Sequence, residues 1–280
     1  MSALSLADQA KRNAAFAAVD RHVTPEVRVL GVGTGSTVVF AVERLAELKQ
    51  QGRTHPDLVC VPTSFQSTQL IADAGLRTAD LNDLLPLDPT GGCPASIDVT
   101  IDGADEVDSE LNVIKGGGAA HLREKVVAAA SKKLVIIGDH RKDATTLGEK
   151  WDQGVPVEVT PIAWRSIKSQ IERLTPLSRA PAAAAGPAAA AAAFEFASPV
   201  AVLRQAVRKA GPVVTDNGNF VLDVRVGKIF DPAAVEQAIK MIPGVIEVGI
   251  FCRMASEAWF GNDDGSIAWR IPQSLVKEQD

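Results

Sequence analysis

Residues 97–125 read IDVTIDGADEVDSELNVIKGGGAAHLREK, and this stretch decides the expected fold and site. It begins with a mostly apolar, β-branched run at residues 97–101, which is typical of a buried strand. An acidic group at residues 102–105 follows, and a lysine with three glycines at 115–118 precedes a run of good helix formers at 119–131. Two carboxylates, an ammonium group and flexible backbone near one strand suit a small anionic molecule that undergoes proton transfer.

The composition predicts a globular protein that can bury a core. The 280 residues are 46% hydrophobic and 22% charged, and their number allows one large domain or two smaller ones. The net charge of −5 argues against a nucleic-acid surface, although backbone amides can still bind a phosphate. No apolar run could span a bilayer, and the N-terminus resembles an amphipathic helix more than a signal peptide. Three cysteines without metal spacing, Cys60, Cys93 and Cys252, predict free thiols and a cytoplasmic location.

Three further apolar runs in the first half also end in small or polar residues. They cover residues 27–32, 57–61 and 133–137, and predicted helices at 37–49 and 66–74 lie between them. Strands that alternate with helices predict an α/β fold with a Rossmann-like parallel sheet. Ligands of such sheets bind beyond the carboxyl ends of the strands, so the four polar groups are expected on one rim.

The pattern changes after about residue 151 and predicts a second, smaller α+β domain, of ferredoxin-like type. We expect one domain from residues 1–153 with 252–280 and another from 154–251, which carries a low-complexity, alanine-rich surface insertion at about 176–198. The expected elements of the second half are a strand at 155–160, a helix at 161–174, a hairpin at 213–226, a helix at 231–242 and a strand at 245–251.

A glycine-rich turn, GVGTGST at residues 31–37, follows a strand and opens a helix. Its glycines allow close backbone approach, and the helix N-terminus with the hydroxyls of Thr34, Ser36 and Thr37 can bind an anion. A dinucleotide fingerprint is disfavoured because Ser36 stands where the third glycine would be. A purely structural turn is the alternative.

Asp102 and Asp105 follow the strand of the opening stretch. Carboxylates there can hydrogen-bond sugar hydroxyls or exchange protons with them. Two alternatives stay open: a solvated acidic loop, because Glu106, Asp108 and Glu110 come next, or a site for a hard cation.

Lysines and one glutamate complete the candidate residues. Lys115 beside three glycines could place an ammonium group against a developing oxyanion. Glu124 stands between Arg123 and Lys125, which by itself reads as a solvent-facing charged triplet, and Lys142 reads as a surface lysine. The four histidines lack the spacing of a zinc site.

Five segments together resemble the ribose-5-phosphate isomerases of type A. They are GVGTGST at 31–37, IDGADEVD at 101–108, IKGGGAAHLREK at 114–125, VVTDNGNFVLDV at 213–224 and IPGVIEVGIF at 242–251. These segments cover both halves of the chain. The segment PTSFQS at 62–67 is similar to the eukaryotic, particularly fungal, branch, whereas the alanine-rich insertion departs from the family pattern.

The resemblance implies interconversion of D-ribose 5-phosphate and D-ribulose 5-phosphate through an enediolate in the non-oxidative pentose phosphate pathway, without metal or organic cofactor. It implies that Glu124 accepts the proton and that Asp102, Asp105 and Lys115 are also catalytic. The substrate-binding residues that it implies are Thr34, Gly35, Ser36, Thr37, Gly103, Ala104, Gly116, Gly117, Gly118 and Lys142. The expected partner is a small sugar phosphate, with no nucleic acid and no membrane, and the expected assembly is a homodimer or homotetramer.

A non-catalytic sugar-phosphate sensor on a related scaffold is the alternative function. The same scaffold also carries acyl-CoA transferases and glucosamine-phosphate deaminases, so the fold alone does not decide. A sensor could keep its glycine loops and lose the base. The presence of Glu124, Asp102, Asp105 and Lys115 therefore favours the isomerase.

The absence of histidine or cysteine clusters in the sequence predicts that activity does not depend on a metal ion. Turnover should survive exhaustive dialysis against EDTA, measured in a coupled isomerase assay. Loss of turnover that Mg²⁺ or Mn²⁺ restores would instead identify Asp102 and Asp105 as cation ligands.

Overall fold

The computed structural model describes residues 4–84, 97–174 and 199–276. Cys93 and the predicted insertion at 176–198 lie outside these ranges. The chain forms two compact units: unit 1 comprises residues 1–104, 123–143 and 253–280, and unit 2 comprises residues 105–122 and 144–252. The domain boundaries expected from the sequence stay a prediction.

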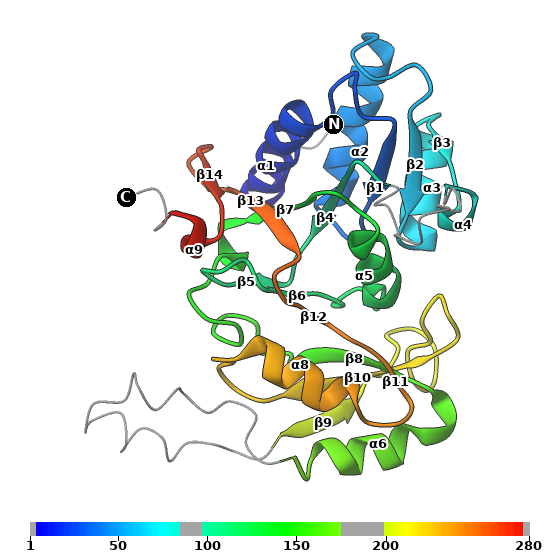
Figure 1. Cartoon of the computed structure of the whole chain (residues 1–280), viewed down its shortest axis with the longest axis vertical. Helices are drawn as coiled ribbons and strands as arrows, with labels where there is room; N and C mark the ends of the chain where they lie inside the picture. The colour runs from blue at the N-terminus through cyan, green and yellow to red at the C-terminus, as the bar shows by residue number, and fades with distance from the viewer. Residues whose placement is uncertain (1–3, 85–96, 175–198, 277–280) are drawn as a thin grey trace, which may run out of the picture. The chain divides into compact units, whose positions relative to one another are not determined.

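Unit 1 is built on a seven-stranded sheet with the order β14-β13-β7-β4-β1-β2-β3 (Figure 1). All neighbouring strands pair in parallel except β13 and β14, which are antiparallel. The strands are β1 (Val29–Val32), β2 (Val59–Pro62), β3 (Arg77–Thr78), β4 (Val99–Gly103), β7 (Leu134–Asp139), β13 (Ala255–Gly261) and β14 (Ile267–Arg270). The parallel α/β sheet expected from the first half of the chain is confirmed.

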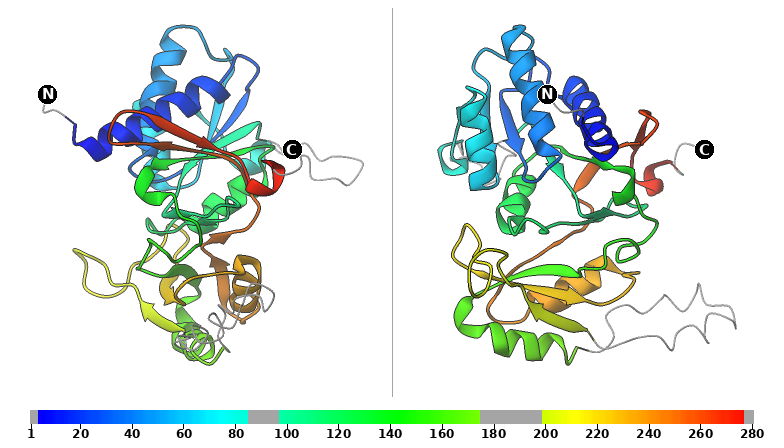
Figure 2. Two further views of the ribbon diagram at one scale, coloured as in Figure 1. Left: turned by 90° about the vertical axis from the view of Figure 1, so that its left-hand side faces the viewer. Right: turned by 180° about the vertical axis from the view of Figure 1, so that it is seen from behind.

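Helices cover both faces of this sheet (Figure 2). The helices described in unit 1 are α1 (Leu6–His22), α2 (Val38–Gln50), α3 (Phe65–Asp73), α4 (Leu81–Leu84), α5 (His121–Ala129) and α9 (Gln273–Val276), with the short 3₁₀ helix η1 (His140–Lys142) after β7. Side chains of a strand alternate between faces, so Leu30 and Val32 of β1 pack with α1 and α2 while Gly31 lies against Val127 of α5.

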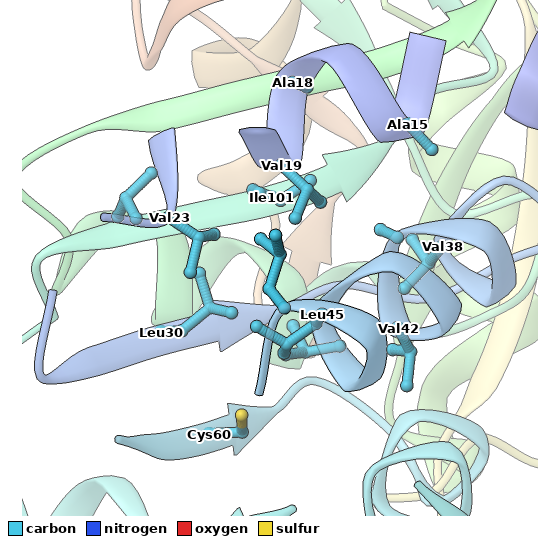
Figure 3. Close-up of a cluster of buried hydrophobic side chains, with 14 of the residues drawn as sticks. Ala15, Ala18, Val19, Val23, Leu30, Val38, Val42, Leu45, Cys60 and Ile101 are labelled. Atoms are coloured by element: carbon cyan, nitrogen blue, oxygen red, sulfur yellow. The ribbon is translucent and has the colours of Figure 1, made fainter. Parts of the chain in front are cut away.

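The main core of unit 1 lies between the sheet and helices α1 and α2 (Figure 3). Helix α1 begins at Ser5, whose side chain accepts the N–H of Asp8, and it buries a stripe of alanines. The small residues let the helix approach closely: a Cβ on Gly261 of β13 would lie 1.9 Å from the carbonyl oxygen of Ala10. Cys60 of β2 is fully buried in the same core.

The order of the strands reverses between β1 and β4. From β1 the chain proceeds to β2 and β3 on one side, and from β4 to β7 and β13 on the other. Sheets of this type bind ligands beyond the carboxyl ends of the strands at such a switch point. The glycine-rich turn follows β1 and Asp102 lies near the end of β4, so both belong to this position.

Unit 2 contains a four-stranded antiparallel sheet, β11-β8-β10-β9, and a three-stranded sheet, β12-β6-β5. Its elements are β5 (Glu106–Val107), β6 (Val113–Ile114), β8 (Val155–Val159), η2 (Pro161–Ala163), α6 (Trp164–Ile171), β9 (Val200–Leu203), β10 (Phe220–Arg225), α8 (Pro232–Lys240), β11 (Val245–Val248) and β12 (Ile250–Phe251). Asp231 caps α8 by accepting the N–H of Ala234, as the Asp-Pro pair predicts.

Two expected elements of unit 2 are wrong in detail. Only the second arm of the hairpin expected at 213–226 is a strand, β10, and in the first arm the amide of Val213 donates to the carbonyl of Arg204 and not to β10. The strand at 245–251 is broken at Gly249, whose N–H donates to the carbonyl of Pro156 over 2.7 Å. The two resulting strands, β11 and β12, belong to different sheets.

A buried carboxylate holds the turn before β10. Glu158 of β8 is fully buried, and its Oε1 accepts hydrogen bonds from Thr215 Oγ1 at 2.8 Å, Asn217 Nδ2 at 3.0 Å and Asn219 Nδ2 at 2.9 Å. The motif TDNGN therefore supplies donors to a core acceptor in addition to forming a turn. A buried donor that loses its acceptor is costly, so this contact fixes the turn.

Glu158→Leu should therefore lower the free energy of unfolding by about 1–3 kcal/mol, because the buried Thr215 hydroxyl loses its acceptor while the more exposed amides of Asn217 and Asn219 can turn to water. Glu158→Gln retains an acceptor oxygen and should cost clearly less. Chemical denaturation followed by circular dichroism checks the order. Equal losses in the two variants would show that the acceptor oxygen does not stabilise the turn.

Candidate functional site

In unit 1, Asp102 binds the glycine-rich turn. Its carboxylate is fully buried, and Oδ1 accepts the N–H of Thr34 at 3.1 Å and the N–H of Gly103 at 2.7 Å. A Cβ on Gly33 would lie 2.0 Å from the same oxygen, so only glycine permits this approach. The turn after β1 and the aspartate of β4 therefore form one group, as expected for the rim of the sheet.

Residues after β2 complete this group; they are expected on the same rim from the sequence, which assigns them no catalytic or binding role. The hydroxyl of Thr34 lies 2.7 Å from the hydroxyls of both Thr63 and Ser64, and the amide of Gly35 donates to Gln66 Oε1 at 2.9 Å. Ser64 also caps α3 in a capping box with Ser67. Their position at the carboxyl end of a predicted strand was the available signal.

The N-terminus of α2 can bind an anion. Thr37 is its N-cap residue and makes no side-chain capping hydrogen bond, while Ser36 beside it is exposed. Thirteen residues of helix direct their dipole toward this end, which favours a negative charge such as a phosphate.

Glu124 lies in the first turn of α5 and is 4% exposed, whereas Arg123 and Lys125 are half-buried. The interpretation of these residues as a solvent-facing charged triplet is therefore wrong. A carboxylate in the first turn of a helix is stabilised by the helix dipole, but burial removes it from water. Such a buried, ionisable group is a candidate for proton transfer.

Lys142 ends η1, the turn after β7, and is half-buried. The preceding Asp139 is buried and is bound by the guanidinium of Arg141, with Nε–Oδ1 at 2.6 Å. Burial acts to raise the pKa of Asp139, but the hydrogen bond and charge of Arg141 outweigh it and lower the pKa overall. The side chain of Asp139 also accepts the N–H of Arg141, so the turn that carries Lys142 has a fixed beginning.

In unit 2, Asp105 is bound to the second glycine loop. Its Oδ2 accepts the N–H of Gly117 at 2.6 Å, and a Cβ on Gly117 would lie 2.5 Å from Oδ1. Gly116 has φ +106°, and a Cβ there would lie 2.6 Å from a ring nitrogen of His121. The glycines are therefore required by close contacts, which argues against a merely flexible tip.

Lys115 precedes this loop and is 2% exposed. Its amide donates to the carbonyl of Gly249 at 2.9 Å, and its Nζ lies 5.7 Å from the ring centroid of Phe251. The backbone and the aromatic ring thus hold the ammonium group in unit 2. Gly118 is exposed.

The acidic residues after Asp105 are not a solvated loop. Glu106 is fully buried and accepts the backbone N–H groups of Gly148, Glu149, Lys150 and Trp151. Asp108 is 6% exposed and accepts the amides of Glu110 and Asn112. These two carboxylates bind the backbone of loops in unit 2. Glu106 and Asp108 are therefore not part of a solvated acidic loop.

The expected site residues thus form two local groups. Unit 1 holds the turn at 34–37 with Asp102, Gly103 and half-buried Ala104, and also Glu124 and Lys142, while unit 2 holds Asp105, Lys115 and the loop at 116–118. The peptide bond between Ala104 and Asp105 joins the two aspartate groups. Within the described ranges, no cluster of three or more His, Cys, Asp or Glu side chains could hold a metal ion.

Comparison with known proteins gives one consistent family. The family model of ribose 5-phosphate isomerase A (phosphoriboisomerase A) matches residues 59–265. A ribose-5-phosphate isomerase of Mycosarcoma maydis is 45% identical over 281 residues, covering 99% of this chain and 86% of the relative. That of Homo sapiens is 45% identical over 269 residues, covering 96% and 75%.

Solved structures of ribose-5-phosphate isomerases are also similar to this chain. A D-ribose-5-phosphate isomerase in complex with phospho-erythronic acid matches with a TM-score of 0.76 and 34% identity, covering 95% of this chain and 99% of that one. Ribose 5-phosphate isomerase from Plasmodium falciparum matches with a TM-score of 0.76 and 31% identity, covering 94% and 98%.

The close contact between Gly33 and Asp102 makes a specific prediction. Gly33→Ala must displace the carboxylate, and a misplacement of this size should lower kcat/KM by about 100-fold. Adding Gly33→Ala to Asp102→Ala should have little further effect, because both changes act on the same group. Steady-state kinetics of the two single variants and the double variant check this. Additive losses would mean that the added methyl group acts elsewhere.

Proposed function

This chain belongs to the ribose 5-phosphate isomerase A family, and we propose how its own residues carry the reaction of that family. It is an aldose–ketose isomerase that interconverts D-ribose 5-phosphate and D-ribulose 5-phosphate. The observation that carries the proposed mechanism is the burial of Glu124, a carboxylate at 4% exposure between the half-buried residues Arg123 and Lys125.

Glu124 is the carbon base. Its carboxylate takes the proton from C2 of the open-chain aldose, the electron pair of that C–H bond forms the C1–C2 double bond, and the carbonyl oxygen at C1 becomes the oxyanion of an enediolate. The proton of the C2 hydroxyl passes to the O1 oxyanion, and the same carboxyl group returns the carbon-bound proton to C1, which leaves a hydroxyl at C1 and the carbonyl at C2. A single buried carboxylate serves both steps because the two carbons are adjacent.

Lys115 supplies positive charge to the enediolate oxygen. Burial of its ammonium group strengthens such an interaction because little water competes with it. Its backbone bond to Gly249 and the ring of Phe251 limit the positions that the ammonium group can take, which lowers the cost of reorganisation.

Asp102 and Asp105 bind the sugar, and one of the two carboxyl groups opens its ring. A closed sugar needs a proton on its ring oxygen and loses one from the C1 hydroxyl, and a carboxyl group can exchange both. We assign this step to Asp102. Asp105 then orients hydroxyls together with the loop that it binds through Gly117.

The phosphate binds at the N-terminus of α2, where Thr34, Gly35, Ser36 and Thr37 present amides and hydroxyls, and Lys142 adds a positive charge. The phosphate takes no part in bond making. Its binding energy holds the reacting carbons in register, so it contributes to the ground state and the transition state alike.

We also propose that the protein is a cytoplasmic homodimer or homotetramer that uses no cofactor. Cys60 in the described part of the chain is a buried free thiol. None of the helices that the structure describes has the length and apolar character needed to cross a membrane.

Glu124→Gln keeps the shape of the side chain but removes the proton acceptor. We expect kcat to fall by about 10²–10⁴ with a much smaller change in KM. The matched control is Glu43→Gln, the same chemical change at a partly exposed residue of α2 that pairs with Arg12; it should leave kcat unchanged. If well-folded Glu124→Gln turns over within threefold of wild type, the base lies elsewhere.

Lys142→Ala should mainly raise KM, because it removes binding that is common to the ground and transition states. Affinity for phospho-erythronic acid, measured by calorimetry, should fall in parallel. Lys132→Ala is the control, since that lysine pairs with Asp98 at the surface of unit 1. A fall in kcat with KM and inhibitor affinity unchanged would contradict a role in phosphate binding.

A further inference from the structure

The second glycine loop is held by an arginine outside the residues assigned above. We propose that Arg204, itself fixed by Asp223, is a positioning residue that sets the backbone of Gly116 and Gly117 so that the loop binds Asp105. The inference rests on the proposed function, because it concerns how Asp105 and this loop take part in the isomerase reaction.

The guanidinium group of Arg204 binds both the carboxylate of Asp223 and the backbone of the glycine loop. Nε and Nη2 bind the two carboxylate oxygens of Asp223, with Nε–Oδ2 at 2.9 Å, in the paired arrangement that arginine and carboxylate groups favour. Nη1 donates to the carbonyl oxygen of Gly116 at 2.8 Å and to that of Gly117 at 3.1 Å. One side chain thus links β10 to two successive peptide groups of the loop.

The loop needs such a constraint because its backbone is intrinsically free. Successive glycines lose more conformational entropy on ordering than other residues do, and Gly116 adopts φ +106°. The amide of Ala119 donates to the carbonyl of Gly116 at 2.9 Å and closes a turn, but Ala119 itself has φ +59°, which is unfavourable for a residue with a Cβ. Local bonding alone therefore leaves the loop strained, and Arg204 adds contacts that offset this.

Arg204 affects Asp105 through the single peptide group between Gly116 and Gly117, which both residues bind. The plane of the peptide between Gly116 and Gly117 carries the carbonyl that Arg204 binds on one side and the N–H that donates to Asp105 on the other, at 2.6 Å. Because a peptide group is planar, fixing its carbonyl oxygen also fixes its N–H. Arg204 thus determines the direction from which the loop binds the carboxylate.

Asp223 explains why this arginine positions residues and does not bind substrate. Its carboxylate neutralises the guanidinium, and the side chains of the pair are only 15% and 20% exposed. The remaining donor group, Nη1, is already engaged with the loop. Lysine could not replace the arginine, since a single ammonium group cannot keep both carboxylate contacts and both carbonyl contacts in this geometry.

Kinetics of three variants, each made in the whole 280-residue chain, test the proposal. Arg204→Met should lower kcat by about 10- to 100-fold with a smaller change in KM, because the loop is misplaced. Arg204→Lys should recover only part of this loss. Arg225→Met removes an exposed arginine from the same unit and should leave kcat unchanged.

Hydrogen exchange supplies a readout that does not depend on activity. Amide exchange in the segment around residues 115–119 should speed up in Arg204→Met, while exchange in the core strand β8 stays as in wild type. If Arg204→Met does not fold, Asp223→Asn serves instead, since it keeps the guanidinium but loosens its anchor. Wild-type exchange at the loop in the folded variant would overturn the proposal even if activity changed.

A double-mutant cycle with Asp105→Asn separates positioning from general destabilisation. If Arg204 acts through the loop that binds Asp105, the losses in kcat combine less than additively. Additive losses would assign Arg204 a structural role alone and overturn the proposal. A wild-type protein without isomerase turnover would refute the proposed function, whereas the exchange result would still decide whether Arg204 holds the loop.

Discussion

The hydrogen bond from the amide of Thr34 to the buried carboxylate of Asp102 joins the two central strands of unit 1 at their carboxyl ends. Only a glycine at position 33 allows the turn to approach the carboxylate this closely. The turn in turn sets the start of α2, whose N-terminus can bind a phosphate. The strand order reverses between β1 and β4, so the segments that follow these two strands lie side by side. The hydrogen bond between Thr34 and Asp102 therefore positions both the anion-binding helix end and the carboxylate of Asp102.

Carboxylates that accept backbone N–H groups also position loops in unit 2. Asp105 and Glu106 are adjacent in the sequence, but one binds the amide of Gly117 and the other binds four successive amides of the loop at 148–151. Glu158 binds the turn before β10 in a similar way, through side-chain donors. Asp105 is half-buried, whereas Glu106 and Glu158 are fully buried and must be satisfied by donors, and here those donors lie in loops and turns, whose conformation the bonds fix.

The parallel sheet, its helices and the rim that carries Asp102 could be predicted because each depends on residues close in the sequence. A β-branched run followed by a turn and a helical spacing determines the element, and the parallel order determines the rim. The same reasoning could not show that Glu124 is buried, because burial depends on the packing of α5 and not on its charged neighbours. It also could not find Arg204, which binds Gly116 from 88 residues away. The sequence predicts a continuous strand through Gly249, because the close approach of Lys115 and Pro156 to this glycine depends on the three-dimensional fold.

Close packing of the core in unit 1 also has a chemical consequence for Cys60. Burial between the sheet and helices raises the pKa of this thiol to about 12, so at neutral pH almost none of it is thiolate. Oxidants, alkylating reagents and disulfides react with the thiolate and need access to it. The folded unit 1 therefore shields Cys60 from changes in cellular redox state, and its labelling by a thiol reagent would report unfolding of the sheet.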